Sequence, residues 1–342
     1  MTALLFYAGG RFATRAFKER LIIMKKAGVL LAIGAVAGAA YYKFNDWFYN
    51  SLLDRDFEIP EVLGRMITAS DEGPDADKER ISHDMRWLNS CKIEKHSIIS
   101  DRGCRLQGYL MRPEKESDVY VFGAHGYRSD GKGEWCHYAK HYVEDLGYNM
   151  FFVDHQAAGE SEGHYYGFAS FESEDCMKWL GYMLDTFGRD IKIILHGISM
   201  GSTTVLIMSG KNELPENVKF TVADCGFTSA MDEFTYKLKS WHVPDFPIIP
   251  TIKAMQKKRA GYDFQKDTDA LGAMKNARVP VLFIHGDKDK FVPTYMAALL
   301  HDACTAEYKD ILIVRGADHA MSYKEGKEEY EAKVQEFIDR FI

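Results

Sequence analysis

Short apolar runs alternate with longer amphipathic segments along most of the chain after residue 92. Runs such as Val119 to Ala124 and Ile191 to His196 have the length and composition of buried strands, and the segments between them have the spacing of helices. Strands are expected at 93–100, 105–111, 119–124, 149–154, 191–196, 220–224, 281–285 and 311–315, and helices at 133–146, 171–187, 202–211, 294–304 and 325–341. This alternation predicts βαβ units and a mostly parallel central sheet flanked by helices.

A serine stands in the turn that follows the strand expected at 191–196. The sequence there is Gly-Ile-Ser-Met-Gly, with Ser199 at its centre, and a helix-compatible run comes next. Glycines on both sides allow a turn so sharp that the serine oxygen stands clear of the backbone. The strand, turn and helix together predict a nucleophile elbow with Ser199 at its apex. The alternative role for Ser199 is that of a helix N-cap.

A nucleophilic serine needs a base and an acid that orients the base, and in an elbow of this kind they follow the serine in the order acid, then histidine. The next-to-last expected strand runs into a loop that carries Asp287 and Asp289, and the last is followed by His319. Ligands bind at the carboxyl ends of strands in open parallel sheets, which is where these groups are expected. The pattern predicts a triad of Ser199, His319 and one of the two aspartates.

The chain from about residue 92 onward resembles the α/β-hydrolases, in the subgroup called serine aminopeptidase-like or prolyl-oligopeptidase-like. In particular it is similar to bacterial hydrolases with an N-terminal membrane segment. The matching motifs are Ala124-His125-Gly126-Tyr127, Asp154-His155-Gln156-Ala157-Ala158-Gly159-Glu160-Ser161, the Ser199 turn, Ala223-Asp224-Cys225-Gly226-Phe227, the loop with Asp289, and Asp318-His319-Ala320-Met321-Ser322-Tyr323. The resemblance implies an α/β-hydrolase fold with a short cap after the sixth strand. The spacing from His285 to Pro293 resembles the family pattern and favours Asp289 over Asp287.

Two backbone N–H groups are expected to bind the negative charge of a tetrahedral intermediate. One comes from the residue after the nucleophile, and the other comes from the loop after the third strand. These residues are Met200 and Tyr127. Gly126 is expected to be the steric requirement of that loop.

The segment 229–266 carries three prolines and several aromatic residues but no strand pattern. We interpret it as the cap, with Trp241 and Phe246 lining a substrate pocket. Apolar side chains at these positions favour a partly apolar substrate. The alternative is a plain surface excursion.

The N-terminal part carries an uncharged run from Ala27 to Tyr42 between basic flanks. We expect residues 1–24 to be an uncertain extension, 25–44 a membrane anchor or signal segment, 45–90 a tether and lead-in helix, and 91–342 the hydrolase domain. Met24 is an alternative start to Met1. The basic flank predicts one span with the domain outside the cytoplasm. Secretion after cleavage near Ala39 and a cytoplasmic-facing domain stay open.

Composition excludes some functions. A net charge of −7 and the lack of a basic stripe in the catalytic part disfavour a nucleic-acid partner. Six cysteines without metal-ligand spacing favour no metal site and no cofactor. The histidines His155, His164, His196 and His285 are interpreted as hydrogen-bonded loop residues.

These features predict a serine hydrolase that cleaves carboxylic ester bonds of a small-molecule acyl substrate through an acyl-enzyme intermediate. The alternatives are a peptidase of the aminopeptidase type, an acyltransferase on the same triad, and a non-catalytic membrane-tethered binding module. A peptidase would favour a cluster of acids in the cap as an anchor for the substrate amine. The cap offers Glu233, with Asp232 and Asp245.

Overall fold

The computed structural model describes residues 38–58 and 83–342. Its contacts divide the chain into two units, one that ends at Leu52 and one that runs from Leu53 to Ile342. In the first unit the described residues, 38–52, are helical. No helix in the described ranges is long and apolar enough to cross a membrane. Most of the predicted anchor, 25–44, lies outside those ranges.

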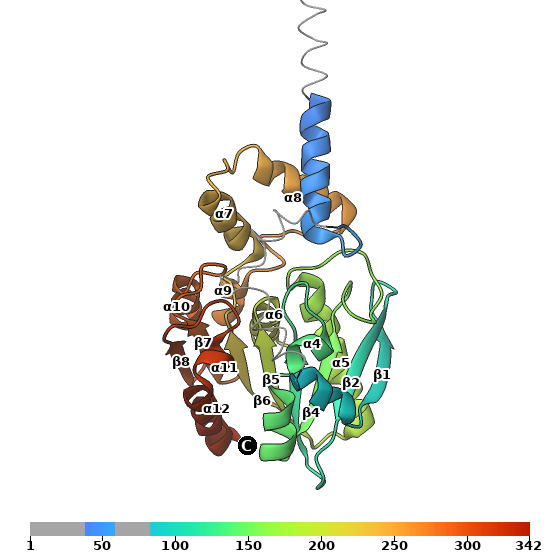
Figure 1. The fold of residues 1–342 in the computed structure, drawn as a ribbon, viewed down its shortest axis with the longest axis vertical. Helices are drawn as coiled ribbons and strands as arrows, with labels where there is room; N and C mark the ends of the chain where they lie inside the picture. Colours follow the sequence, from blue (N-terminus) through green and yellow to red (C-terminus); the bar gives the residue numbers. More distant parts are fainter. Residues whose placement is uncertain (1–37, 59–82) are drawn as a thin grey trace, which may run out of the picture. The chain divides into compact units, whose positions relative to one another are not determined.

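The second unit is built on one eight-stranded sheet (Figure 1). The strands are β1 (Glu94–Ile99), β2 (Arg105–Met111), β3 (Val119–Ala124), β4 (Asn149–Asp154), β5 (Lys192–Ile198), β6 (Val218–Asp224), β7 (Val281–Gly286) and β8 (Lys309–Val314). Their order is β1-β2-β4-β3-β5-β6-β7-β8. β2 pairs antiparallel with both β1 and β4, and all other neighbouring strands pair parallel. The prediction of a mostly parallel sheet is confirmed.

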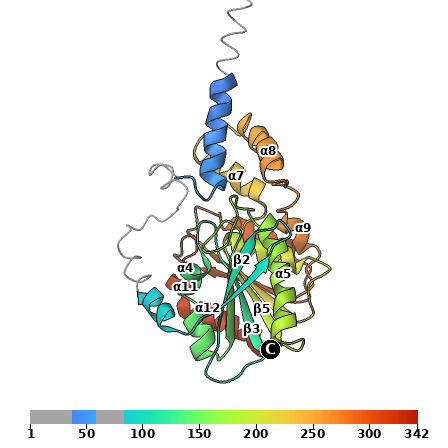
Figure 2. The same cartoon turned by 90° about the vertical axis from the view of Figure 1, so that its right-hand side faces the viewer.

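Helices cover both faces of the sheet because its central strands are apolar on both sides (Figure 2). In β3, Val119 and Val121 point into the core on one face, and Tyr120 and Phe122 point into the core on the other. The first face packs against α4 (Gly131–Trp135) and α12 (Lys327–Phe341), and the second against α5 (Ser170–Phe187) and α6 (Met200–Ser209). On the second face, α9 (Ala270–Met274) and α10 (Tyr295–Ala303) continue the layer beside β7.

The prediction of one continuous helix at 133–146 is wrong. The segment forms the short helix α4 and then a π-helical turn, η1 (His141–Asp145), in which the N–H of Leu146 donates to the carbonyl of His141. The hydroxyl of Tyr142 lies 2.9 Å from Nδ1 of the buried His196, whose Nε2 lies 2.8 Å from the hydroxyl of Tyr330. A buried imidazole needs partners, and the π turn supplies one that periodicity alone does not reveal.

The segment interpreted as a cap, 229–266, contains two helices, α7 (Ala230–Ser240) and α8 (Ile248–Arg259). The side chain of Ser229 accepts from the N–H of Asp232 and caps α7. At the C-terminus, the helix expected at 325–341 is observed as α12, and a short helix, α11 (Ser322–Glu325), precedes it. Whether the cap acts as a lid stays a prediction.

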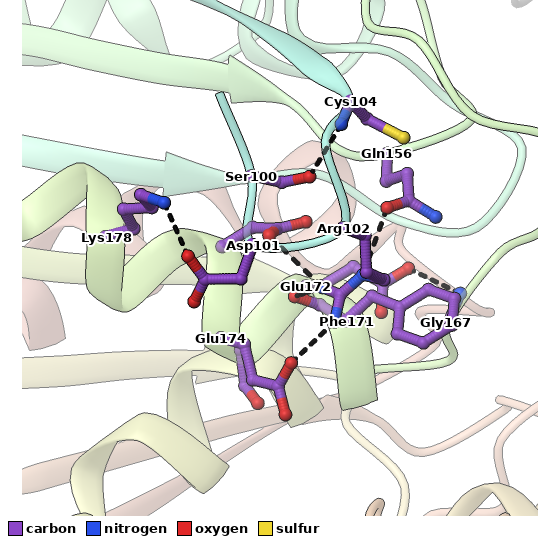
Figure 3. Close-up of polar contacts among 12 residues, drawn as sticks. Ser100, Asp101, Arg102, Cys104, Gln156, Gly167, Phe171, Glu172, Glu174 and Lys178 are labelled. Atoms are coloured by element: carbon purple, nitrogen blue, oxygen red, sulfur yellow. Dashed lines mark hydrogen bonds and ion pairs between the residues drawn. The ribbon is translucent and has the colours of Figure 1, made fainter. Parts of the chain in front are cut away.

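A polar network joins the β1–β2 turn to the start of α5 (Figure 3). The guanidinium of Arg102 donates to Glu174 at 2.6 Å and to Asp175 at 3.1 Å. Beside it, the buried carboxyl of Glu172 accepts from the N–H groups of Gly167 at 2.8 Å and Ala169 at 2.9 Å. These bonds fix the loop before α5, in which Phe168 and Ala169 have positive φ angles of 49° and 79°.

Glu172 gives the protein a pH-dependent stability. Burial raises its pKa from 4.5 to about 7, although the backbone N–H groups lower it. The folded protein therefore holds this proton at pH values where the unfolded chain has lost it. The resulting stabilisation is complete below about pH 4.5 and is lost as the pH rises through 7.

The free energy of unfolding should fall with rising pH by up to about 1.4 kcal/mol per pH unit because of this one group. We expect Glu172→Gln to remove that part of the pH dependence. Urea unfolding between pH 5 and 8 measures the slope for each variant. Glu174→Gln, at a half-exposed carboxylate on the same helix, is the matched control. Identical slopes in wild type and Glu172→Gln would contradict the assignment, whatever the absolute loss of stability.

Candidate active site

The turn between β5 and α6 places Ser199 in a strained conformation. Its φ and ψ are 55° and −115°, and its N–H donates to the carbonyl of Asp224 at 2.8 Å. A Cβ atom on Gly197 would overlap the carbonyl of Gly201, and one on Gly201 would overlap the carbonyl of Ala124. The two glycines therefore allow the close approach that the sequence pattern predicts.

Three side chains from three strand ends form one hydrogen-bonded row. Nε2 of His319 lies 2.9 Å from Oγ of Ser199, and Nδ1 of His319 lies 2.7 Å from Oδ2 of Asp289. Ser199 follows β5, Asp289 follows β7, and His319 follows β8. The structure thus brings together the three residues selected from the sequence. This geometry lets a base accept the serine proton while a carboxylate holds the ring.

Asp289 is buried, and its carboxylate is surrounded by donors. Oδ1 accepts from the N–H groups of Phe291 and Val292, both at 2.8 Å. Burial by itself raises the pKa of Asp289, but His319 and His285 oppose it, so the pKa lies well below the usual value. The carboxylate is therefore ionised at neutral pH.

His285 is a second imidazole on the same carboxylate. Its ring is fully buried, with Nε2 3.1 Å from Oδ2 of Asp289 and 2.8 Å from the carbonyl of Val292. Burial lowers the pKa of His285, but the contact with Asp289 outweighs it and the pKa is raised. The interpretation of His285 as a loop residue is wrong, because it lies in β7, and the sequence did not indicate Asp289 as its partner.

The other two aspartates have different partners. Oδ1 of Asp287, which is exposed, accepts from the N–H of Gly316 at 2.6 Å. Oδ1 of Asp318 accepts from the backbone N–H of His319 at 2.8 Å. The choice of Asp289 over both is therefore consistent with the geometry around the imidazole of His319.

The loop after β3 lies against the elbow. A Cβ on Gly126 would lie 3.4 Å from Cβ of Ser199. Nε2 of His125 accepts from the N–H of His155 at 3.0 Å, so Nδ1 carries the proton and donates to the carbonyl of Gly126 at 2.7 Å. Burial lowers the pKa of His125 and keeps the ring neutral. This bond fixes the peptide whose N–H belongs to Tyr127.

Helix α7 reaches the site through charged residues. Nζ of Lys237 lies 3.7 Å from the ring centroid of Phe291, and that ring is 4.8 Å from the ring of His319. One turn earlier, Glu233 is buried, and neither carboxylate oxygen has a hydrogen-bond partner in the described part of the chain. Burial raises the pKa of Glu233 to about 8. The charge of Asp289 raises this pKa as well, and the charge of Lys237 lowers it.

An aromatic cluster extends from the loop after β3 to the cap. The ring of Tyr127 lies 4.9 Å from that of Phe168, which lies 5.2 Å from that of Phe234 on α7. Phe234 in turn packs on Phe264 at 5.1 Å. This aromatic cluster, made of Tyr127, Phe168, Phe234 and Phe264, forms an apolar connection between the loop of Tyr127 and the cap.

The predicted pocket residues lie at less enclosed positions. Trp241 is the residue directly after α7 and is half-buried, and the side chain of Phe246 is 75% exposed. Their role in a pocket stays a prediction. Sequence reasoning missed Phe291 as a neighbour of His319 and Lys237 as a neighbour of Phe291. The one available signal is the four-residue spacing of Glu233 and Lys237, which places both on one face of a helix.

Known structures with a similar fold identify the fold of this chain. The structure of the esterase Pf2001 from Pyrococcus furiosus is similar with a TM-score of 0.57 at 18% identity, over 80% of this chain and 96% of that one. Acetyl xylan esterase 1 from Thermoanaerobacterium sp. JW/SL YS485 is similar with a TM-score of 0.53 at 17% identity, over 82% and 98%. The protein has the α/β-hydrolase fold.

The sequence comparisons define the family. The prolyl oligopeptidase family matches residues 140–342, more than half of the chain, and the chain belongs to this family. Among curated proteins, the uncharacterized protein YqkD of Bacillus subtilis (strain 168) is 27% identical over 251 residues, which cover 72% of this chain and 80% of that protein. Protein bem46 of Schizosaccharomyces pombe (strain 972 / ATCC 24843) is 23% identical over 212 residues, which cover 60% and 63%.

Proposed function

We propose that the protein cleaves carboxylic esters, with Ser199 as nucleophile, His319 as base and Asp289 as the acid that orients it. The row from Ser199 Oγ through His319 to Asp289, at 2.9 and 2.7 Å, is the observation that carries the proposal. Oγ bonds to the carbonyl carbon as Nε2 takes its proton. The alcohol then leaves with that proton, and water releases the acid from the acyl-enzyme by the same two steps.

Two backbone N–H groups are proposed to bind the oxyanion. Met200 is the first residue of α6, and the first N–H groups of a helix have no partner inside it. The Gly126 carbonyl and the Tyr127 N–H belong to one trans peptide and point in opposite directions. Because His125 holds that carbonyl, the N–H of Tyr127 is held on the other side. Fixed dipoles of this kind are effective because they need no rearrangement during the reaction.

An ester with an apolar acyl group fits the surroundings of the proposed nucleophile. The aromatic cluster begins at Tyr127, in the loop that lies against the Ser199 turn, and supplies apolar side chains on that side. Peptidase activity is the second candidate, and one observation favours it. The buried carboxyl of Glu233 has no hydrogen-bond partner in the described ranges, and a substrate amine would provide one.

Esters and amides with the same acyl group separate the two candidates. We expect kcat/KM for a medium-chain ester to exceed that for the matched anilide by at least about 100-fold. Aminoacyl anilides serve as the third substrate class. If they are the best substrates and Glu233→Gln abolishes that preference, the peptidase proposal replaces the esterase proposal.

Asp289→Asn should lower the turnover of the best ester by about 10⁴-fold, because the amide stabilises the wrong tautomer of the base. Asp287→Asn is the matched control, since that carboxylate is exposed and accepts from the backbone of Gly316. It should retain most of the activity. A larger loss in Asp287→Asn than in Asp289→Asn would reverse the assignment.

The cap is proposed to set acyl specificity. Phe234→Ala should change the relative kcat/KM of esters of different chain length by a factor that corresponds to about 1–3 kcal/mol, because its ring belongs to the aromatic cluster. Trp241→Ala and Phe246→Ala should change the same ranking less, since Trp241 is half-buried and Phe246 is 75% exposed. The measurement is a chain-length profile of kcat/KM for each variant. A uniform decrease with no change in ranking would show that the cap is scaffold.

We further propose that the N-terminal segment attaches the protein to a membrane, with the catalytic domain outside the cytoplasm. The uncharged run between Lys26 and Lys43 supports this proposal. In the described helix, Tyr42 and Trp47 are exposed, and such side chains favour the membrane–water interface.

Fractionation of cells tests the attachment. Full-length protein is expected in the membrane pellet, and a shortened chain that begins near Asn45 is expected in the soluble fraction. Protease added to intact cells should digest the catalytic domain if it lies outside. A mature protein that begins near Ala40 would show cleavage instead of anchoring.

A further inference from the structure

A thiol lies beside the proposed triad and takes no part in it. Sγ of Cys225, a carboxylate oxygen of Asp289 and a ring nitrogen of His319 lie within 4.8 Å of one another. Cys225 and Asp289 are buried, and His319 is partly exposed. No spacing in the sequence indicates this group, because its three members follow three different strands.

The topology fixes the thiol in this place. Cys225 directly follows β6, which lies in the sheet between β5, which leads to Ser199, and β7, which leads to Asp289. Its φ of 49° lies in the left-handed region. Its N–H donates to the carbonyl of Ile284 in β7 at 2.9 Å. The side chain is thereby held at the carboxyl end of the sheet, with the proposed catalytic residues.

Sulfur, imidazole nitrogen and carboxylate oxygen form a donor set typical of Zn²⁺. With bonds of 2.0 to 2.3 Å, tetrahedral zinc holds its ligand atoms about 3.3–3.8 Å apart. The ligand atoms lie within 4.8 Å of one another, so the more distant ones would have to approach by up to about 1.5 Å. Nδ1 of His319 and Oδ2 of Asp289, which are 2.7 Å apart, would have to separate by about half an ångström if both bound the metal. A water molecule can complete the four ligands.

We propose that Cys225, Asp289 and His319 form an inhibitory site for Zn²⁺ or Cd²⁺. Binding forms a metal–sulfur bond, breaks the S–H bond and releases the thiol proton to solvent. If the metal takes Nδ1 of His319, the ring proton must move to Nε2, which can no longer accept from Ser199. If it takes Nε2, that lone pair is occupied. In both cases the serine loses its base.

Inhibition of the active site rests on the proposed function, so two readouts are needed. The first is the rate at which a fluorophosphonate labels the full-length protein with and without ZnCl₂. Zn²⁺ should slow labelling of wild type at least about tenfold at a concentration that leaves Cys225→Ser unaffected, and EDTA should restore it. Cys304→Ser is the matched control because Cys304 is also buried but lies on α10's C-terminal side, away from the triad.

The second readout does not depend on activity. Cd²⁺ bound by a thiolate gives a charge-transfer absorbance. Ser199→Ala protein should show this absorbance, and in the double variant Ser199→Ala/Cys225→Ser it should be smaller by the contribution of one thiolate. If Cys225→Ser does not fold, Cys225→Gly removes the sulfur and suits the left-handed backbone. Equal Zn²⁺ sensitivity with and without the sulfur, or a Cd²⁺ absorbance unchanged by its removal, would overturn the site. Failure of the proposed function would instead appear as no labelling of wild type, with the Cd²⁺ absorbance intact.

Discussion

The close approach of backbone segments around Ser199 is the constraint on which the rest of the site depends. Gly197 packs against Gly201, and Gly201 packs against the carbonyl of Ala124, with no room for a Cβ atom at either position. This contact joins the elbow to the end of β3, so the loop with Gly126 comes to lie beside the serine. A backbone φ of 55° at Ser199 is unfavourable by itself and is maintained by this packing and by the bond to Asp224.

Much of this arrangement could be predicted from the sequence, because local patterns indicate the strands and turns and the order of the motifs along the chain indicates the three residues. Apolar runs mark the strands, and a parallel sheet places the residues after those strands at one edge. That reasoning selects Ser199, Asp289 and His319. It also favours Asp289 over Asp287, although only by resemblance to a family, because both aspartates lie in the same loop.

The remaining features depend on tertiary contacts that a sequence pattern does not encode. The π turn at Tyr142 is set by a hydrogen bond to His196, and the partner of His285 is a carboxylate at close range. Lys237 lies beside Phe291 because α7 contacts the loop that follows β7, where the hydroxyl of Tyr236 donates to the carbonyl of Lys290. Phe246, selected for its aromatic character, is 75% exposed, since a proline-rich segment can present an aromatic ring to solvent as readily as to a pocket.

Buried carboxyl groups are a recurring feature of this chain. Burial raises the pKa of Glu172 and Asp224 to about 7 and that of Glu233 to about 8. Each costs stability at high pH, and the latter two lie near the proposed catalytic residues. Asp289 differs because two imidazoles and two N–H groups hold its charged form. The site thus combines two acids whose pKa is raised by burial with one acid that is held ionised.

The central claim is that Ser199 is the nucleophile, and covalent labelling tests it most directly. Wild-type protein is treated with a fluorophosphonate and digested, and the modified peptide is sequenced by mass spectrometry. The account predicts one adduct, on Ser199, that is lost when the protein is unfolded before treatment and in Ser199→Ala. An adduct on another residue, or undiminished labelling of Ser199→Ala, would contradict it.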